Sequence, residues 1–306
     1  MYFSYFRKPN NKITLSMDLS KWVLIPILKA LSKIPLSILF VLSDFLYFVG
    51  YKIIGYRKKV VRDNLRTCFP DKSQLELREI EEKFYKHLFD VMVETIRGFS
   101  MPKDELLKRY FLKDNQQKLD LLATDKPIMM VMTHKGNWEW SIVAAPLVLG
   151  VKTYGVYKIL SNSSMEDFMK AKRGRNGSIP TPMEKIYFSL RNEETRPYIA
   201  AFIADQNPAS VKNAFWTSFL NRDTPFMNGY AMIAKKMGMK MVFADIEKVK
   251  RGYYGIHLVD ICEDASLMSV DDIMSKTTKA MERDIIRQPE LWLWSHRRWK
   301  HKKPSE

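Results

Sequence analysis

The segment from Thr133 to Glu139 reads Thr-His-Lys-Gly-Asn-Trp-Glu and places a histidine, His134, five positions before a glutamate, Glu139. Across one turn at the start of a helix, a carboxylate at this spacing can accept a hydrogen bond from one ring nitrogen and fix the tautomer of the imidazole. The other ring nitrogen is then free to take a proton from a hydroxyl. The spacing therefore predicts a general base, His134, oriented by Glu139; the alternative is a structural histidine that caps a helix.

No nucleophile motif accompanies this pair. The chain has no G-x-S-x-G, and neither Cys68 nor Cys262 has a base in its motif. Gly136 permits close approach of the backbone, and the N-terminus of a following helix would offer amide donors to a developing oxyanion. We therefore expect direct attack by the hydroxyl of an acceptor, without an acyl-enzyme. The two cysteines lie far apart, have no metal-type spacing and make no disulfide framework, so we expect a reduced, cytosol-facing location. No metal-ligand cluster is visible in the sequence and acyl transfer of this kind needs no metal or redox cofactor, so we expect neither.

Strands and helices alternate along the chain and bring polar residues to the ends of strands. The run Lys126–Thr133 has the length of a strand and ends at His134, and the run Pro197–Ala204 ends at Asp205. Such alternation predicts an α/β fold, a sheet covered by helices, with ligands bound where the strands end. The other expected elements are strands at Val151–Val156 and Lys240–Glu247 and helices at Ser73–Phe99 (with a Ser73/Glu76 capping box), Trp138–Leu149, Met227–Lys236 and Ser269–Arg287.

The N-terminal part of the chain has the composition of a membrane segment. Residues Ile34 to Ile54 are apolar over about 20 positions, roughly the length of one bilayer crossing, although Asp44 interrupts the run. A cluster of Lys and Arg residues follows, as at the cytoplasmic end of an anchored helix. We predict a membrane-anchoring segment at 1–55 and one catalytic domain at 56–306. A buried helix of a soluble domain is the alternative, and a spanning or an in-plane helix fits the pattern equally.

The charge of the chain points to a polyanionic partner. Lys and Arg together number 50 and Asp and Glu 34, which gives +16 over 306 residues. An anionic membrane or an acidic protein would suit this surplus. No zinc-finger spacing and no RNP-like aromatic motif is present, so we expect no nucleic acid.

Six segments, in order along the chain, resemble motifs of the lipid A biosynthesis late acyltransferases, the lauroyl/myristoyl transferase family. The central one, His134–Glu139, matches H-x-G-N-W-E, a form of the H-x4-D/E motif of glycerolipid acyltransferases. Thr217 stands where the family usually has Pro. The other matches are Asn64–Pro70 to N-L-x-x-x-F-P, Arg173–Gly177 to R-x-R-x-G, Asp205–Pro208 to D-Q/H-x-P/G, Phe215–Leu220 to F-V-P-F-F-G, and Pro289–Lys300 to P-E-Q-W-L-W-x-H-R-R-F-K.

This resemblance implies a mixed sheet and an enzyme at the cytoplasmic face of the bacterial inner membrane. The enzyme would move a fatty acyl group from acyl carrier protein, or from acyl-CoA, to a hydroxyl of a lipid A precursor. His134 would be the general base with Glu139 as its partner. The resemblance places further residues near the substrate: Asn137, Asp205 and one or other of Arg173 and Arg175, between which the sequence does not choose.

Several alternatives stay open on the sequence alone. The acceptor could be another membrane lipid, such as an amino-acid lipid or a glycerophospholipid, or the chain could be a non-catalytic membrane-surface binder. Arg173 and Arg175 could be a solvated charge run, and Asp205 could cap the turn at Asn207-Pro208. Trp292 and Trp294 suit either the core or an interfacial belt. Peripheral cations, among them Lys58, Lys59, Arg297 and Arg298, are expected to attract the membrane or the carrier protein.

Overall fold

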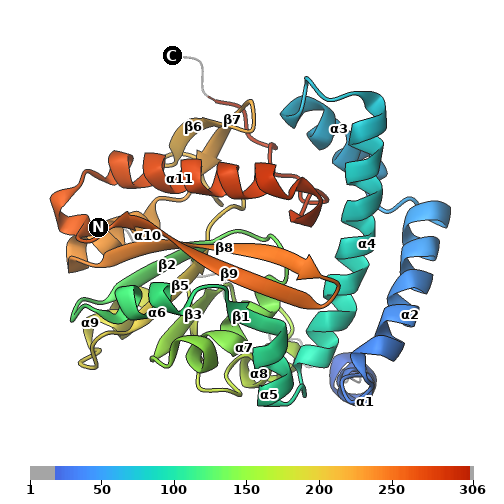
Figure 1. The fold of residues 1–306 in the computed structure, drawn as a ribbon, viewed down its shortest axis with the longest axis horizontal. Coiled ribbons are helices and arrows are strands. Elements are labelled where there is room, and N and C mark those ends of the chain that lie inside the picture. The colour runs from blue at the N-terminus through green and yellow to red at the C-terminus, as the bar shows by residue number, and fades with distance from the viewer. Residues whose placement is uncertain (1–17, 304–306) are drawn as a thin grey trace.

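The computed structural model describes residues 18–303 and shows a seven-stranded sheet in the order β1-β9-β8-β2-β5-β3-β4. All neighbouring strands are parallel except β8 and β9, which form an antiparallel hairpin, so the sheet is mixed. Helices α10 and α11 cover one face and α7 the other, while the long helix α4 stands beside the sheet with α2 outside it (Figure 1). The short β6–β7 hairpin forms a separate two-stranded sheet.

The strands are β1 Tyr110–Leu112, β2 Ile128–Met132, β3 Thr153–Tyr157, β4 Ile179–Pro182, β5 Ile199–Ile203, β6 Phe215–Phe219, β7 Arg222–Phe226, β8 Lys240–Lys250 and β9 Tyr253–Cys262. The α-helices are α1 Ile25–Leu31, α2 Leu36–Tyr47, α3 Lys58–Cys68, α4 Gln74–Gly98, α5 Lys103–Arg109, α6 Asn115–Leu122, α7 Trp138–Leu149, α8 Ser163–Arg173, α9 Ile186–Arg191, α10 Gly229–Met237 and α11 Val270–Arg287. Two π-helical segments, η1 Ser20–Leu24 and η2 Phe48–Ile53, and two short 3-10 helices, η3 Ala265–Leu267 and η4 Pro289–Leu291, complete the described chain.

The predicted α/β fold is confirmed, and each predicted strand and helix lies within a few residues of an observed one. Ser73 caps α4 through the predicted box: its hydroxyl accepts from the Glu76 amide, and the Glu76 carboxylate accepts from the Ser73 amide. Strand β2 is apolar throughout because both faces of the sheet are covered. Met129 and Val131 point into one core cluster and Met130 and Met132 into the other.

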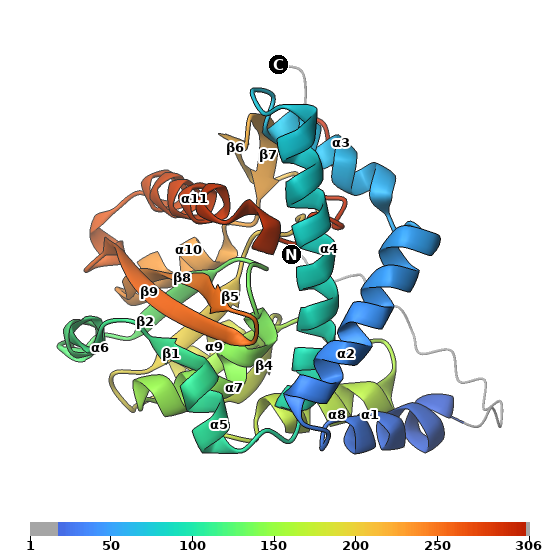
Figure 2. The ribbon, with the colours of Figure 1, turned by 45° about the vertical axis from the view of Figure 1, so that its right-hand side comes forward.

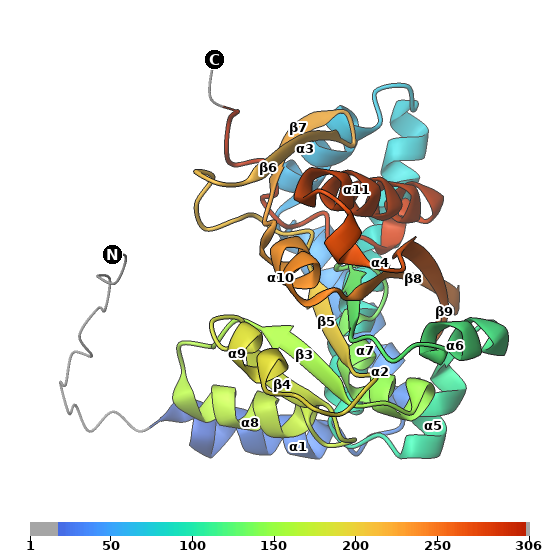
Figure 3. The ribbon, with the colours of Figure 1, turned by 90° about the vertical axis from the view of Figure 1, so that its left-hand side faces the viewer.

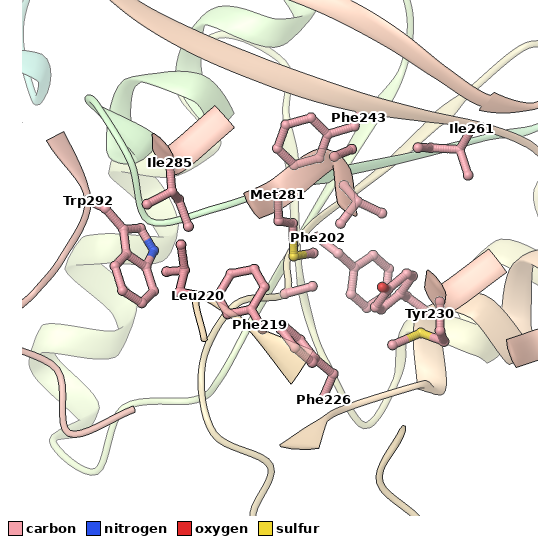
Figure 4. Packing of buried hydrophobic residues seen from close by; sticks show 14 of the residues in the cluster. Phe202, Phe219, Leu220, Phe226, Tyr230, Phe243, Ile261, Met281, Ile285 and Trp292 are labelled. Carbon is pink, nitrogen blue, oxygen red and sulfur yellow. The ribbon is translucent and has the colours of Figure 1, made fainter. Parts of the chain in front are cut away.

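The core on the α10–α11 side is rich in aromatic residues (Figure 4). Trp292 packs edge-to-face against Phe219, and Phe219 packs in the same way on Phe226. Trp292 also contacts Trp294 at a centroid distance of 4.7 Å. These contacts attach the β6–β7 hairpin and the segment after η4 to the sheet domain. Trp292 and Trp294 are thus core residues rather than members of an interfacial belt.

The N-terminal helices lie on the outside of α4 (Figure 2). Within residues 18–303, one helical stretch, Leu36–Ile53, is long and apolar enough to cross a membrane, and 28% of it is buried. Leu36 and Leu39 of α2 enter the core, and Phe40, Leu42 and Leu46 pack against it, whereas Ile38, Val41 and Phe45 are exposed. Asp44, which interrupts the apolar run, pairs with Arg251 of the β8–β9 turn at 2.6 Å. The exposed apolar side chains of this stretch are Ile38, Val41, Phe45, Phe48 and Ile53.

Candidate active site

The loop between β2 and α7 carries the residues predicted to do chemistry. Within this loop, Gly136 packs against Ile246 of β8 and adopts a positive φ of 61°. A Cβ at this position would lie 2.7 Å from Cγ2 of Ile246, so the close approach requires glycine. The Gly136 amide donates to the Leu291 carbonyl oxygen at 3.1 Å, and Nε2 of His87 lies 3.3 Å from the Gly136 carbonyl oxygen. Burial lowers the pKa of His87 well below its usual range, so the ring is neutral and its Nε2–H donates.

His134 is held by Asp205, which follows β5. Nδ1 of His134 lies 2.6 Å from Oδ1 of Asp205, and the His134 amide donates to Oδ2 at 2.9 Å. The Trp292 indole donates to the same Oδ2 at 2.6 Å. Burial raises the pKa of Asp205, but the charge of His134 and these donors outweigh burial, and the pKa falls to about 2. An ionised Asp205 only accepts hydrogen bonds, so Nδ1 of His134 carries a proton and Nε2 is the basic nitrogen.

The predicted contact between Glu139 and the His134 ring is therefore wrong. Strand β5 lies beside β2, and Asp205, two positions after the end of β5, binds the imidazole in place of Glu139. Glu139 lies in the first turn of α7 and accepts from Arg173, with Nη2 to Oε1 at 2.8 Å and Nε to Oε2 at 3.2 Å. Both side chains are about one-fifth exposed. They line a pocket between α7 and the ends of α4 and α8.

Arg173 and Arg175 have different surroundings, because the chain turns at Gly174 after α8 ends. Arg173 reaches the pocket with Glu139, whereas Arg175 donates to the Met101 carbonyl oxygen at 2.7 Å. Burial lowers the pKa of Arg175. Arg173 thus lines the pocket, whereas Arg175 attaches this turn to the α4–α5 corner, so the two arginines, between which the sequence did not choose, have different contacts.

Asn137 and Asp205, both predicted to contact substrate, are buried. Asn137 is the N-cap of α7: its Oδ1 accepts from the Trp140 amide at 3.0 Å, and its Nδ2 donates to Glu94 at 2.8 Å. Burial raises the pKa of Glu94, which also accepts from Tyr254. Asn137 is fully buried and Asp205 is 2% exposed, and the hydrogen bonds of both side chains are to groups within the protein.

Lys135 connects the loop to α11. Its ammonium is fully buried and donates to Asp284, with Asp245 at 3.7 Å. Burial, together with the neighbouring Asp245, raises the pKa of Asp284. Thr133 also donates to Asp284 at 3.3 Å. The residues on either side of His134 are therefore fixed by buried polar contacts.

The arrangement is a histidine–aspartate pair at adjacent strand ends, followed along the chain by a helix, α7, whose first turn lines a pocket with Arg173. A family model described as bacterial lipid A biosynthesis acyltransferase matches residues 9–301. The chain belongs to this family. It is therefore an acyltransferase.

Curated members of the lipid A acyltransferase family align over most of this chain. The lipid A biosynthesis palmitoleoyltransferase of Escherichia coli is 22% identical over 90% of this chain and 89% of its own length. The lipid A biosynthesis lauroyltransferase of the same organism is also 22% identical, over 91% of this chain and 90% of its own length. Among solved structures, the 1-acyl-sn-glycerophosphate acyltransferase of Thermotoga maritima covers 84% of this chain and 96% of its own, at 13% identity and a TM-score of 0.35.

In this acyltransferase the C-terminal segment supports the site, which the sequence did not reveal. Arg298 is fully buried, although we expected a peripheral cation. It donates to the Asn207 side chain at 3.1 Å and to the Pro225 carbonyl oxygen at 2.7 Å. Burial lowers its pKa to about 10. Arg298 thus holds the loop after Asp205, and the P-E-L-W-L-W-S-H-R-R-W-K match was the one signal that pointed to this segment.

Proposed function

We propose that the enzyme transfers a fatty acyl group from a thioester of acyl carrier protein to a hydroxyl of a lipid A precursor, at the cytoplasmic face of the bacterial inner membrane. The observation that carries the proposal is the His134–Asp205 pair, which makes Nε2 of the ring the basic nitrogen. A pocket lined by Lys172 and Arg173 lies against α7, the helix that follows the His134 loop. The names of the curated relatives support a lipid A acceptor. Acyl-CoA is the alternative donor, and another membrane lipid the alternative acceptor.

The mechanism follows from the tautomer. The acceptor hydroxyl gives its proton to Nε2 of His134 as its oxygen attacks the thioester carbonyl carbon, and Asp205 stabilises the imidazolium. The tetrahedral intermediate collapses with cleavage of the C–S bond. The departing thiolate takes the proton from Nε2, so His134 is regenerated and no acyl-enzyme forms.

Arg173 is the side chain best placed to meet a phosphate of the acceptor. Glu139 holds its guanidinium through two hydrogen bonds, and a guanidinium has five N–H donors, so three stay available. Arg173 lines the pocket together with Lys172. We propose that Glu139 aims Arg173, so that Glu139 contributes to catalysis through the arginine.

A separate apolar cavity is suited to the acyl chain. It lies between α7 and strands β1, β8, β9 and β2, and it includes Met132, two positions before His134. Its volume of about 20 Å³ is far smaller than an acyl chain. The flexible side chains of Met130 and Met132 would have to move aside on binding.

The proposal is tested with purified enzyme in detergent, given labelled acyl carrier protein thioester and a lipid A precursor, with the acylated lipid detected by mass spectrometry. We expect one acyl group added per lipid and no product with His134→Ala. Donor choice is measured by running acyl-CoA in parallel. A wild-type protein that acylates neither a lipid A precursor nor another membrane lipid would refute the proposed activity.

A further inference from the structure

Gln206 follows Asp205 directly and reaches the basic nitrogen of the site. Its side-chain Nε2 lies 3.1 Å from Nε2 of His134. Among the hydrogen bonds of residues 18–303, this is the one that the Gln206 side chain makes. The backbone around it is fixed, because the next residue, Asn207, donates to the Arg297 carbonyl oxygen and accepts from buried Arg298.

The direction of this contact is set by Asp205. Since the ionised carboxylate accepts from Nδ1 of His134, Nε2 of the neutral ring has a lone pair and needs a donor. The amino group of the Gln206 amide supplies it. In the free enzyme, this amino group therefore occupies the place from which an acceptor hydroxyl must give its proton to His134.

Three backbone amides near His134 donate to protein acceptors. The amides of His134, Gly136 and Trp140 donate to Asp205, to the Leu291 carbonyl oxygen and to Asn137, respectively. We had expected the start of α7 to offer amides to a developing oxyanion. The amides of Asn137, Trp138 and Glu139 have no acceptor among the described residues, so the start of α7 still offers backbone donors, and a side-chain donor at the reacting centre would act beside them.

We propose that the Gln206 side-chain amide is a catalytic residue that stabilises the oxyanion formed on the thioester carbonyl. The inference rests on the proposed acyl transfer. When the acceptor hydroxyl takes the position at His134 Nε2, it displaces the Gln206 amino group sideways. The attacked carbonyl carbon lies about 3 Å from that hydroxyl oxygen, so the carbonyl oxygen comes within reach of the displaced amide.

The step balances. The hydroxyl proton moves to His134 Nε2, the new C–O bond forms, and the carbonyl π electrons move to the oxygen, which accepts from Gln206 N–H. On collapse the electrons re-form the carbonyl, the C–S bond breaks, and the thiolate takes the proton from His134. The Gln206 amide then returns to Nε2 of the ring. Gln206 donates throughout and is neither protonated nor deprotonated.

The test begins with steady-state kinetics of Gln206→Ala and Gln206→Glu in the full-length protein. Loss of one oxyanion donor costs about 10²–10³-fold in kcat, so we expect that fall with the KM values for donor and acceptor nearly unchanged. Gln206→His keeps an N–H donor on a side chain of similar reach and should recover most of kcat. A kcat within threefold of wild type for both Gln206→Ala and Gln206→Glu would overturn the inference.

Binding of two unreactive donor analogues separates a catalytic role from a structural one. A trifluoromethyl ketone analogue forms a tetrahedral hydrate that resembles the intermediate, whereas a thioether analogue lacks the carbonyl oxygen. Gln206→Ala should weaken binding of the ketone at least tenfold and leave the thioether unchanged. Asn207→Ala, which loosens the same loop and keeps Gln206, should affect both analogues equally. Equal loss of both analogues in Gln206→Ala would overturn the inference, while an inactive wild type would instead refute the proposed function.

Discussion

Nδ1 of His134 lies 2.6 Å from Oδ1 of Asp205, although 71 positions separate the two residues. They meet because β2 and β5 are parallel neighbours, with Met132 opposite Ile203, and the chain leaves both strands at the same edge. Asp205 also accepts from the His134 amide and from Trp292, so its carboxylate is fixed before the substrate arrives. The pair therefore has the geometry of a preorganised general base.

The first prediction concerns this pair. Asp205→Asn should lower kcat by about 10²–10⁴-fold, because an amide can donate to Nδ1 and leave the proton on Nε2, where the base is needed. KM should change little. Steady-state kinetics beside Glu139→Gln gives the comparison: if Asp205→Asn keeps more activity than Glu139→Gln, then Glu139 is the partner of His134 during turnover.

The sequence predicts most of the central helices and strands, but fewer of the contacts within the site. Hydrophobic periodicity located β2, β3, β5 and β8 and the helices α4, α7, α10 and α11, since long apolar segments with caps or strand-length runs are local signals. The ten-residue strand β9 was missed because its sequence, Tyr253–Cys262, has no strict alternation and is recognised by its pairing with β8. The β6–β7 hairpin was also missed, because its two strands are recognised by their pairing with each other.

The second prediction concerns Glu139 and Arg173. Each single substitution, Glu139→Gln and Arg173→Met, should lower kcat/KM, and the double variant should be no worse than the more damaged single one. Residues joined by two hydrogen bonds usually couple by about 0.5–3 kcal/mol. A double-mutant cycle on kcat/KM measures this coupling. Additive losses would show that the two side chains act separately, and Arg175→Ala is a matched control that should affect stability rather than this coupling.

The third prediction concerns the buried cation beside the base. Lys135→Met removes the partner of Asp284 and leaves polar groups buried, which should cost about 3–5 kcal/mol in the free energy of unfolding. The double variant Lys135→Met/Asp284→Leu should recover part of that loss, since both charges are gone. Urea denaturation of the three proteins measures the effect. A single variant as stable as wild type would show that Lys135 is not needed to hold the loop.

The fourth prediction is a pH dependence of stability. The pKa of Asp205 is lowered from 3.8 to about 2 in the folded protein. A group with a lowered pKa stabilises the fold above its unfolded pKa and loses that contribution as the pH falls through its folded pKa. The stability difference between wild type and Asp205→Asn should therefore shrink by ~2 kcal/mol between pH 5 and pH 2. Unfolding curves at several pH values test this, and a difference independent of pH would contradict it.

The site was predicted as a set of residues but not as a set of contacts. The motifs singled out His134, which the structure pairs with Asp205, and Arg173, which it pairs with Glu139, whereas spacing along the chain suggested Glu139 as the partner of His134. Spacing along the chain does not show that β5 lies beside β2, so Asp205 was predicted to contact the substrate rather than the His134 ring. The burial of Asn137 and Arg298 has the same origin, because both are fixed by residues far away in sequence, Glu94 and Pro225 among them.

The fifth prediction concerns the N-terminal helices, of which α1 lies beside α8 in Figure 3 and α2 lies outside α4 in Figure 2. We predict that Val41→Lys/Phe45→Lys moves the enzyme from the membrane fraction to the soluble fraction. Both side chains are more than 60% exposed, so the substitutions leave the core intact. A Lys at the centre of a membrane helix costs about 2.5–3.5 kcal/mol.

Deletion of residues 1–55 is a poorer test of the same idea, because it also removes Leu36 and Leu39 from the core against α4. We expect that truncation to aggregate whether or not the segment binds lipid. The double lysine variant avoids this ambiguity, and Gln116→Lys/Leu119→Lys on the exposed side of α6 is its matched control for added charge. Fractionation and vesicle flotation are the measurements. If the Val41→Lys/Phe45→Lys protein floats with vesicles as well as the α6 control does, α2 is not the membrane anchor, and its apolar face must contact something else.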